Sequence, residues 1–278
     1  MGRRCIAPDG ARSDRRGRAV GNRTIRAAVR AWLVMAVVAT PALMRVDAVA
    51  SDIVLLAALA GGILTFAEYA ARGPAFVEFR DAPPYNRIRL AALAGAVVCS
   101  AMACAPDRPV GALLRAVGEA AAHLADWPGS PMRALLAVVD PDRAAGPAGL
   151  SLLCCAVAVT AFARLSRGGW PGVSGRLNLW TNLPTFDGLD GPEAALRLRR
   201  DARFNVLLGI GGAYLAPTLA AGLHPMHGLS VQNDLVLVWT VALWAFLPTA
   251  CFLRAIALAR VAAVLDGRSV PASSPSLA

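Results

Sequence analysis

Residues 235–253 read LVLVWTVALWAFLPTACFL, nineteen positions without a charged side chain. A helix rises about 1.5 Å per residue, so this stretch is nearly as long as the ~30 Å hydrocarbon core of a bilayer is thick. It contains Pro248, but proline is more frequent in membrane helices than in soluble ones. The stretch therefore predicts a transmembrane helix, which we place at residues 234–254.

Five further apolar runs precede this one. We predict six transmembrane spans, at residues 28–46, 53–71, 89–106, 148–165, 204–223 and 234–254. The composition agrees, because 56% of the 278 residues are hydrophobic and 17% are charged, whereas a soluble domain carries about 25% charge. The predicted fold class is all-α, a polytopic membrane helix bundle with one membrane domain at residues 31–265.

The distribution of arginine predicts the orientation of the spans. All 28 basic residues are arginine, and 23 of them fall on one side of the predicted membrane, in the N-terminal tail, residues 72–89, residues 164–203 and the C-terminus. The opposite side carries five. Because cytoplasmic loops are enriched in basic residues, we predict that both termini are cytoplasmic and that the protein lies in a bacterial inner membrane. The net charge of +10 is then a topology signal, and no nucleic-acid partner is expected.

Both ends of the chain are predicted to lie outside the bundle. Residues 1–30 carry nine arginines and are expected to form a disordered cytoplasmic tail, as are residues 266–278 at the other end. The first span has a second interpretation, because a basic start, an apolar run and the triplet Ala48-Val49-Ala50 resemble a secretory signal with its cleavage site. Arg45 and Asp47 interrupt that pattern, so an uncleaved helix is favoured. Cleavage would leave five spans.

An amphipathic helix is predicted at residues 109–126, on the outer (periplasmic) surface of the membrane. Pro109 suits a first helical turn. The apolar residues that follow share one helical face: Val110, Leu113, Leu114, Val117, Ala121 and Leu124. Arg115, Glu119 and His123 form a polar stripe opposite, and Trp127 is typical of headgroup depth. The next apolar piece, residues 132–139, is too short to span and is expected to be interfacial or re-entrant.

Small residues recur at a spacing of four within the predicted spans, as Ala57/Gly61, Ala58/Gly62, Ala91/Gly95 and Gly209/Ala213. This spacing lets helix backbones approach closely in lipid. We expect it to pack helices of one bundle rather than to form a dimer face.

Two cytoplasmic connectors have the most unusual sequences. Residues 76–87 read FVEFRDAPPYNR and combine two acids, two arginines, three aromatic residues and two consecutive prolines. Residues 170–187 contain WPG and NLWTNLPTFD. A flexible linker would be rich in serine and glycine instead. We therefore expect both connectors to be ordered, to bury their aromatic side chains and to fold against each other.

The candidate functional surface combines these connectors with an acid inside the second span. A carboxylate at membrane depth is a functional candidate, although Glu68 can also pair with Arg72 one turn later at the cytoplasmic rim. For the connectors, the structural alternative is a tight turn with aromatic and arginine anchors. The candidate residues are Glu68, Arg72, Arg80, Asp81, Tyr85, Arg87, Trp180, Asn182 and Asp187.

Metal and catalytic signatures are weak or absent from the sequence. His123, His224 and His227 are all predicted to be external and are weak metal candidates, because Pro225 disrupts the helical spacing of the last two. Five of the six cysteines lie in apolar runs without a C-x-x-C pair, so they are expected to pack as small apolar residues rather than to form a disulfide framework or a zinc site. No nucleotide-binding, hydrolase or haem motif occurs, and no cofactor is expected.

The stretches FVEFRDAPPYNRIR (76–89) and LNLWTNLPTFD (177–187), together with the six-span layout, resemble uncharacterised polytopic inner-membrane proteins of alphaproteobacterial type. That resemblance implies the location and the layout. No activity is assigned to such proteins, so it implies no mechanism.

Three function classes remain open at this stage. A non-catalytic component that supports assembly or organisation of a membrane complex is favoured, with membrane lipids and a membrane-protein complex as partners. A small-solute transporter or channel is the alternative, and a membrane-embedded enzyme on lipid or isoprenoid substrates is the third. A water-filled cavity reaching Glu68 would favour transport, and a lipid-open groove over Arg80 and Asp81 would favour the enzyme. A sealed bundle would favour the first class.

Overall fold

The structure, a computed structural model, describes nine stretches of the chain: residues 9–44, 48–71, 77–80, 82–105, 107–168, 170–171, 183, 191–227 and 233–269. Within these stretches the side chains of residues 9–21, 48–51, 191–192, 220–227 and 267–269 are not described. All regular structure in the described residues is α-helical, without a strand. The all-α prediction is confirmed.

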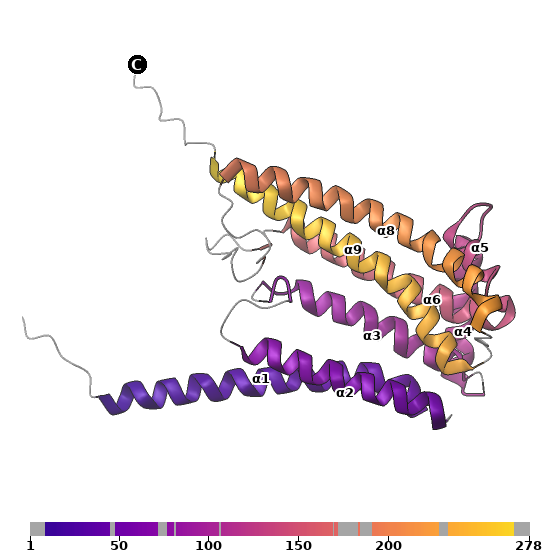
Figure 1. Ribbon diagram of the computed structural model, residues 1–278, viewed down its shortest axis with the longest axis horizontal. Coiled ribbons are helices and arrows are strands. Elements are labelled where there is room, and N and C mark those ends of the chain that lie inside the picture. The colour runs from indigo at the N-terminus through magenta and orange to yellow at the C-terminus, as the bar shows by residue number, and fades with distance from the viewer. Residues whose placement is uncertain are drawn as a thin grey trace, which may run out of the picture.

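The described helices are α1 (Asp9–Met44), α2 (Ala48–Ala70), α3 (Tyr85–Ala103), α4 (Pro109–Ala125), α5 (Pro131–Leu136), α6 (Pro141–Arg167), α8 (Gly191–His227) and α9 (Asp234–Ser269). The six long ones run along the bundle in alternating directions, while α4 and α5 lie at one end of it (Figure 1). We call that end the cap end. The opposite end, where residues 77–80, 82–84 and 170–171 lie, is the connector end. The first and last described residues both lie at the connector end (Figure 1).

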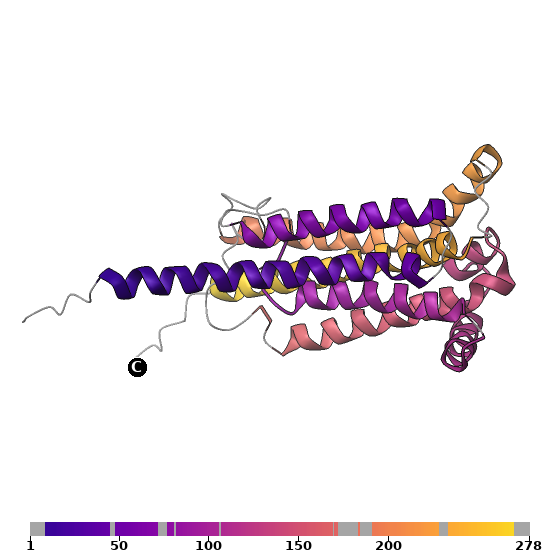
Figure 2. The ribbon, with the colours of Figure 1, turned by 90° about the horizontal axis from the view of Figure 1, so that it is seen from below.

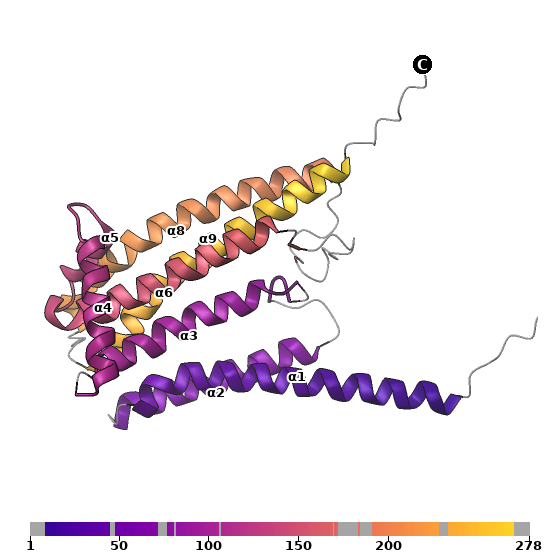
Figure 3. The ribbon, with the colours of Figure 1, turned by 180° about the vertical axis from the view of Figure 1, so that it is seen from behind.

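Five of these helices are long and apolar enough to cross a membrane: residues 22–44 of α1, residues 52–70 of α2, α3, α6 and residues 234–266 of α9. The chain is therefore a multi-pass membrane protein. Helix α8 contains the predicted span 204–223 but is not among the five within the described residues. It nevertheless runs beside α9 along the bundle (Figures 1 and 3).

The ends of the chain differ from the sequence prediction. Residues 1–30 were expected to be disordered, but α1 is helical from Asp9 onward, and α9 continues to Ser269 although a tail was expected from residue 266. Arginine and alanine have high helix propensity, which favours extension of the helix into the basic segment. The last residues of this segment also pack against the protein. Ala27 is fully buried, and the Arg30 guanidinium lies 4.3 Å from the centre of the Tyr69 ring of α2. Residues 1–8 and 270–278 lie outside the described residues.

Small residues bring neighbouring helices together. Gly61 and Gly62 of α2 face Val34 and Met35 of α1, Gly95 of α3 faces Cys154 of α6, and Gly209 of α8 faces Phe252 of α9. These contacts all lie within one bundle. The predicted packing within the bundle is therefore observed at these four glycines.

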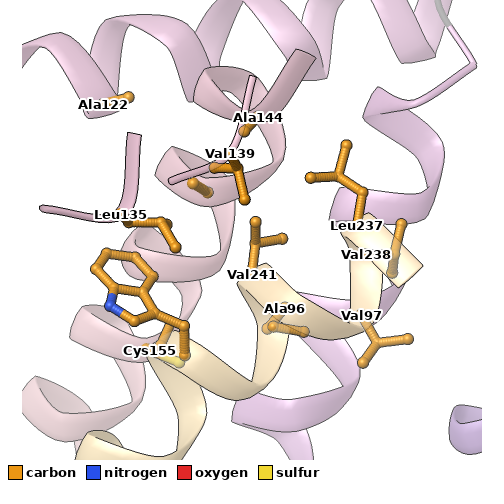
Figure 4. Close-up of a cluster of buried hydrophobic side chains, with 14 of the residues drawn as sticks. Ala96, Val97, Ala122, Leu135, Val139, Ala144, Cys155, Leu237, Val238 and Val241 are labelled. Atoms are coloured by element: carbon orange, nitrogen blue, oxygen red, sulfur yellow. The ribbon is translucent and has the colours of Figure 1, made fainter. Parts of the chain in front are cut away.

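A buried cluster fills the cap end of the bundle (Figure 4). Ala96 and Val97 of α3 meet Leu237 and Val241 of α9 there, and Val139 closes the cluster from the segment after α5. The apolar piece at residues 132–139 was expected to be interfacial or re-entrant. Three of its apolar side chains are buried in this core, with exposed fractions of 5% or less: Met132, Leu135 and Val139. Leu136 and Val138 are only partly buried.

Helix α4 lies across the ends of the long helices rather than along them (Figures 2 and 3). It packs on α6 through backbone, because a Cβ added at Gly118 would overlap the carbonyl group of Gly146, and one added at Gly149 would overlap that of Gly118. Four of the five large apolar residues of α4 are exposed, namely Val110, Leu113, Val117 and Leu124, and Leu114 is partly buried. The predicted amphipathic helix therefore exists and presents its apolar face outward.

Candidate functional site

The first connector turns sharply before α3 begins. Phe79 adopts a left-handed backbone conformation with φ of 54°, and the amide of Ala82 donates to the Phe79 carbonyl oxygen over 3.1 Å. This conformation costs roughly 1–2 kcal/mol for a residue with a Cβ. Burial offsets that cost, because the Phe79 side chain is fully buried. Pro84 then precedes the first residue of α3, where a proline is compatible with a helix start.

Four aromatic rings form a closed cluster behind this turn. Phe79 lies 4.8 Å from Tyr85 and 5.4 Å from Trp170, and Phe162 lies 5.5 Å from Tyr85 and 5.2 Å from Trp170, measured between ring centroids. These separations are typical of tilted and edge-to-face aromatic pairs. The rings come from the first connector, α3, α6 and the second connector. We call these four residues the aromatic cluster.

The two connectors contact each other directly. The indole nitrogen of Trp170 donates to the carbonyl oxygen of Ala82 over 3.2 Å, and both residues are buried. Leu183, in the second connector, is fully buried in the same core. The prediction that the connectors are ordered and fold against each other is therefore confirmed for the parts that the structure describes.

Helix α9 fastens both connectors with two arginines. The Arg254 guanidinium donates twice to the Glu78 carboxylate, from Nε and from Nη2, each over 2.7 Å. The side chains of Glu78 and Arg254 are only 20% and 31% exposed, so this bidentate ion pair is largely shielded. The Arg260 Nε donates to the carbonyl oxygen of Trp170 over 3.1 Å. One helix thus holds the first connector through a carboxylate and the second through a backbone carbonyl.

Glu68 binds the first connector through both its side chain and its backbone. Its Oε2 accepts from the backbone amide of Val77 over 3.3 Å, and its carbonyl oxygen accepts from the Arg80 guanidinium over 2.8 Å. A cation at the C-terminal end of a helix complements the free carbonyl groups of the last turn. Arg72, the partner expected for Glu68, lies outside the described residues. In the structure Glu68 and Arg80 anchor the connector to the end of α2.

The predicted candidate residues therefore separate into four groups. Tyr85 belongs to the aromatic cluster, and Glu68 and Arg80 anchor the first connector to α2. Arg87 is exposed and does not join them. The others lie outside the described residues: Arg72, Asp81, Trp180, Asn182 and Asp187.

Sequence reasoning did not single out the strongest polar contact of the site. Glu78 stood within the quoted stretch, and Arg254 was counted only as a topology charge. They are 176 positions apart, and no periodicity or motif links them. A carboxylate in an ordered connector together with an arginine at the end of a span is the only sequence signal, and many other pairs in the chain share it.

The cap end carries polar groups of a different kind. Its ion pairs are more exposed, with Arg115 on Glu119 over 2.8 Å, Arg133 on Asp126 over 2.9 Å and Arg143 on Asp234 over 2.7 Å. The Arg133 guanidinium, which donates to Asp126, holds the pKa of that carboxyl group below its usual range.

Metal-binding geometry can be judged for one of the three histidines. His123 is exposed, and the described residues contain no group of three or more His, Cys, Asp or Glu side chains that could hold a metal ion. The side chains of His224 and His227 lie outside the described residues.

Several hydroxyl groups of the long helices bind inside the protein. Thr65, Thr160 and Thr218 each donate to the carbonyl oxygen four residues earlier in their own helix, over 2.7 to 2.8 Å. Ser100 of α3 lies 2.8 Å from the Ser151 hydroxyl and donates to the Pro147 carbonyl oxygen over 2.9 Å. These groups therefore already have partners within the bundle and do not offer unpaired ligands along a path.

An apolar groove of about 380 Å³ lies at the cap end between α2 and α9. Its lining consists of Ile53, Val54, Leu235, Val236, Trp239, Thr240 and Leu243. The groove is at the opposite end of the bundle from Arg80 and the aromatic cluster. It is therefore not the lipid-open groove that would place a substrate over Arg80.

Searches against protein-family models, curated proteins and solved structures find no match for this chain. The function is therefore inferred from the geometry of the chain itself. The similarity to alphaproteobacterial membrane proteins stays a prediction.

Proposed function

We propose that the protein is a six-span bacterial inner-membrane protein with its connector end and both termini in the cytoplasm and its cap end in the periplasm. Three observations support this topology. Arginine is enriched 23 to five in the segments assigned to the cytoplasm. Helix α8 runs beside α9 along the bundle, and both described chain ends lie at the same end (Figure 1).

Its proposed role is that of a non-catalytic component that supports assembly or organisation of a membrane complex. The observation that carries this proposal is the aromatic cluster with its Glu78–Arg254 pair, which makes the connector end an ordered surface. Membrane insertion needs only short arginine-bearing loops, so it does not account for a packed structure there. The internal pairing of Glu68 and of the span hydroxyl groups disfavours transport and catalysis at those residues.

The proposed partners are membrane lipids and another membrane protein that binds at the connector end. Exposed arginines lie near the connector-end termini of three helices: Arg87 on α3, Arg164 and Arg167 on α6, and Arg200 on α8. Guanidinium groups near a cytoplasmic surface attract anionic headgroups and acidic side chains. A partner could bind these exposed arginines without disrupting the buried contacts of the connector end.

The topology is tested with reporter fusions along the chain. Fusions after Ala50, Gly146 and Gly228 are expected to read as periplasmic, and those after Pro83, Gly188 and Arg268 as cytoplasmic. A cytoplasmic reading after Gly228 would overturn the six-span topology, because the chain would then not cross the membrane along α8.

The role is tested by quantitative proteomics of the tagged protein after extraction in mild detergent. Arg87→Glu and Arg167→Glu reverse exposed charges at the connector end, and Arg108→Glu reverses an exposed charge at the cap end as a matched control. The proposal expects the same membrane proteins to co-purify with the wild type and the control and to be depleted by the two connector-end variants. Purification without any enriched protein, or equal recovery with all variants, would contradict the proposed role.

A further inference from the structure

Two cysteine thiols from different helices meet between α3 and α6. The side chains of Cys99 and Cys154 lie close enough to interact with each other. The helix backbones are close at this point, because a Cβ added at Gly95 would lie 3.2 Å from the Cys154 Sγ and 3.3 Å from its Cβ. Ser100, next to Cys99, lies within hydrogen-bond distance of Ser151. The two cysteines therefore lie where α3 and α6 pack closely, and a disulfide between two helices needs such a close approach.

The neighbouring cysteine is oriented differently. Cys155 is only 2% exposed, and its side chain lies beside Thr249 of α9. Cys99 and Cys154 are each only partly buried. Of the Cys154-Cys155 doublet, one thiol thus faces α3 while the other is enclosed by α9. Both residues of the pair therefore keep some exposed surface, whereas Cys155 keeps almost none.

We propose that Cys99 and Cys154 form a redox-active pair that closes to a disulfide by exchange with a small external disulfide. One cysteine, as its thiolate, attacks a sulfur of that disulfide, forms a mixed disulfide and releases the first external thiolate. The second cysteine, as its thiolate, then attacks the mixed disulfide at the protein sulfur and releases the second external thiolate. The two protons lost by the cysteines pass to the departing thiolates. Two protein thiols are oxidised, and one external disulfide is reduced to two thiols.

Closure of this pair links α3 to α6 and encloses residues 100–153 in a covalent loop. That loop contains α4 and α5, so the disulfide holds the cap onto the bundle. A disulfide framework, which the sequence does not favour, would need several pairs. A single reversible disulfide between two packed helices needs only one cysteine pair, Cys99 and Cys154.

The test uses a variant that keeps Cys99 and Cys154 while Cys5, Cys104, Cys155 and Cys251 are replaced by alanine. Membranes are treated with the apolar reagent dithiodipyridine, and the protein is analysed by intact mass spectrometry and peptide mapping. A closing pair releases two thiopyridones per chain, loses two hydrogens and keeps no pyridyl adduct. The matched control keeps Cys99 and Cys155. There each thiol that reacts releases one thiopyridone and retains one adduct.

Retained adducts on both Cys99 and Cys154 would overturn the proposal, because they would show that the thiols do not reach each other. Failure to react in membranes, with full reaction after denaturation, would overturn it as well. Four alanine substitutions in one variant can disturb its folding, so peptide mapping of the oxidised wild-type protein is a second, independent test. The linked peptides must contain Cys99 and Cys154. The apparent melting temperature of the oxidised protein in detergent should then exceed that of the reduced protein, and Cys99→Ser should abolish the difference.

Discussion

The two ends of the bundle are held together by different kinds of contact. At the cap end α4 rests on α6 through glycine backbone, and two of its ion pairs, Arg115–Glu119 and Arg133–Asp126, join residues close in sequence and exposed to solvent. At the connector end the aromatic cluster draws on four separate segments. Its main ion pair joins residues 176 positions apart and is largely shielded.

This difference indicates where a substitution will have a large effect. Backbone-to-backbone contact leaves no room for an added side chain, so the cap end should be sensitive to enlargement. Buried rings and a shielded ion pair leave cavities or unpaired charges when truncated, so the connector end should be sensitive to removal of atoms.

The largest effect is expected from Gly118→Leu. The new side chain would overlap the Gly146 carbonyl group, so α4 cannot pack on α6 and the protein should fail to accumulate in the membrane. Gly211→Ala is the matched control, because a Cβ there meets nothing within 4 Å and alanine has the higher helix propensity. The measurement is the amount of protein in membranes and its melting temperature after extraction. Normal accumulation of Gly118→Leu would mean that α4 does not contact α6 as described.

Phe162→Ala should have the next largest effect. The side chain is fully buried between Tyr85 and Trp170, and truncation of a buried phenylalanine costs about 3–5 kcal/mol. Val157→Ala, on the same helix at a residue that is 60% exposed, should change stability little. Denaturation in detergent, followed by the fluorescence of the tryptophans, compares the two variants. Equal stability would mean that the aromatic cluster does not support the connector end.

A double-mutant cycle compares the ion pairs of the two ends. Charged hydrogen bonds that are shielded from water contribute roughly 1.5–3 kcal/mol, so the coupling between Glu78→Ala and Arg254→Ala should fall in that range. The same cycle on Asp126 and Arg133 at the cap end should give no measurable coupling, because that pair is exposed to water. A coupling at the cap end as large as that at the connector end would remove the distinction between the two.

The same difference explains what the sequence could predict. The amphipathic helix at residues 109–126 was predicted with nearly its observed bounds, because its pattern is carried by neighbours three and four positions apart. The burial of Phe79 and Tyr85 was also predicted, from the presence of large apolar rings in an otherwise polar connector. Their partners Phe162 and Trp170, and the pairing of Glu78 with Arg254, depend on how α6 and α9 approach the connectors. No local sequence pattern predicts how these helices pack against the connectors.

The extent of α1 shows a second feature that the sequence did not predict. The apolar runs predicted the described membrane helices, but residues 9–27 were assigned to a disordered tail because of their charge. In the structure they continue α1, since arginine and alanine favour a helix that the membrane span has already nucleated. Hydropathy thus locates the part of a helix that lies in lipid. It does not locate the ends of the helix.

The smallest effect on stability, and the sharpest test of the cap end, concerns the faces of α4. Gly111, Gly118 and Ala122 face the bundle, whereas Leu113 is 66% exposed and Leu124 is 82% exposed. Exposed leucines on a helix that lies across the bundle are accounted for if that face rests in the membrane interface. Glu119, paired with Arg115, would then face water.

Spin labels at Leu113 and Glu119 separate this arrangement from a cap that stands clear of the membrane. Both positions are on the surface of the protein, so neither label should change the melting temperature appreciably. In detergent-free bilayers, the label at position 113 should be shielded from a polar relaxation agent and accessible to oxygen, which concentrates in lipid, while the label at 119 should show the reverse. In a cap surrounded by water the two labels would respond alike. Equal accessibility would therefore mean that α4 does not lie on the membrane surface, although its glycine contacts with α6 could still be correct.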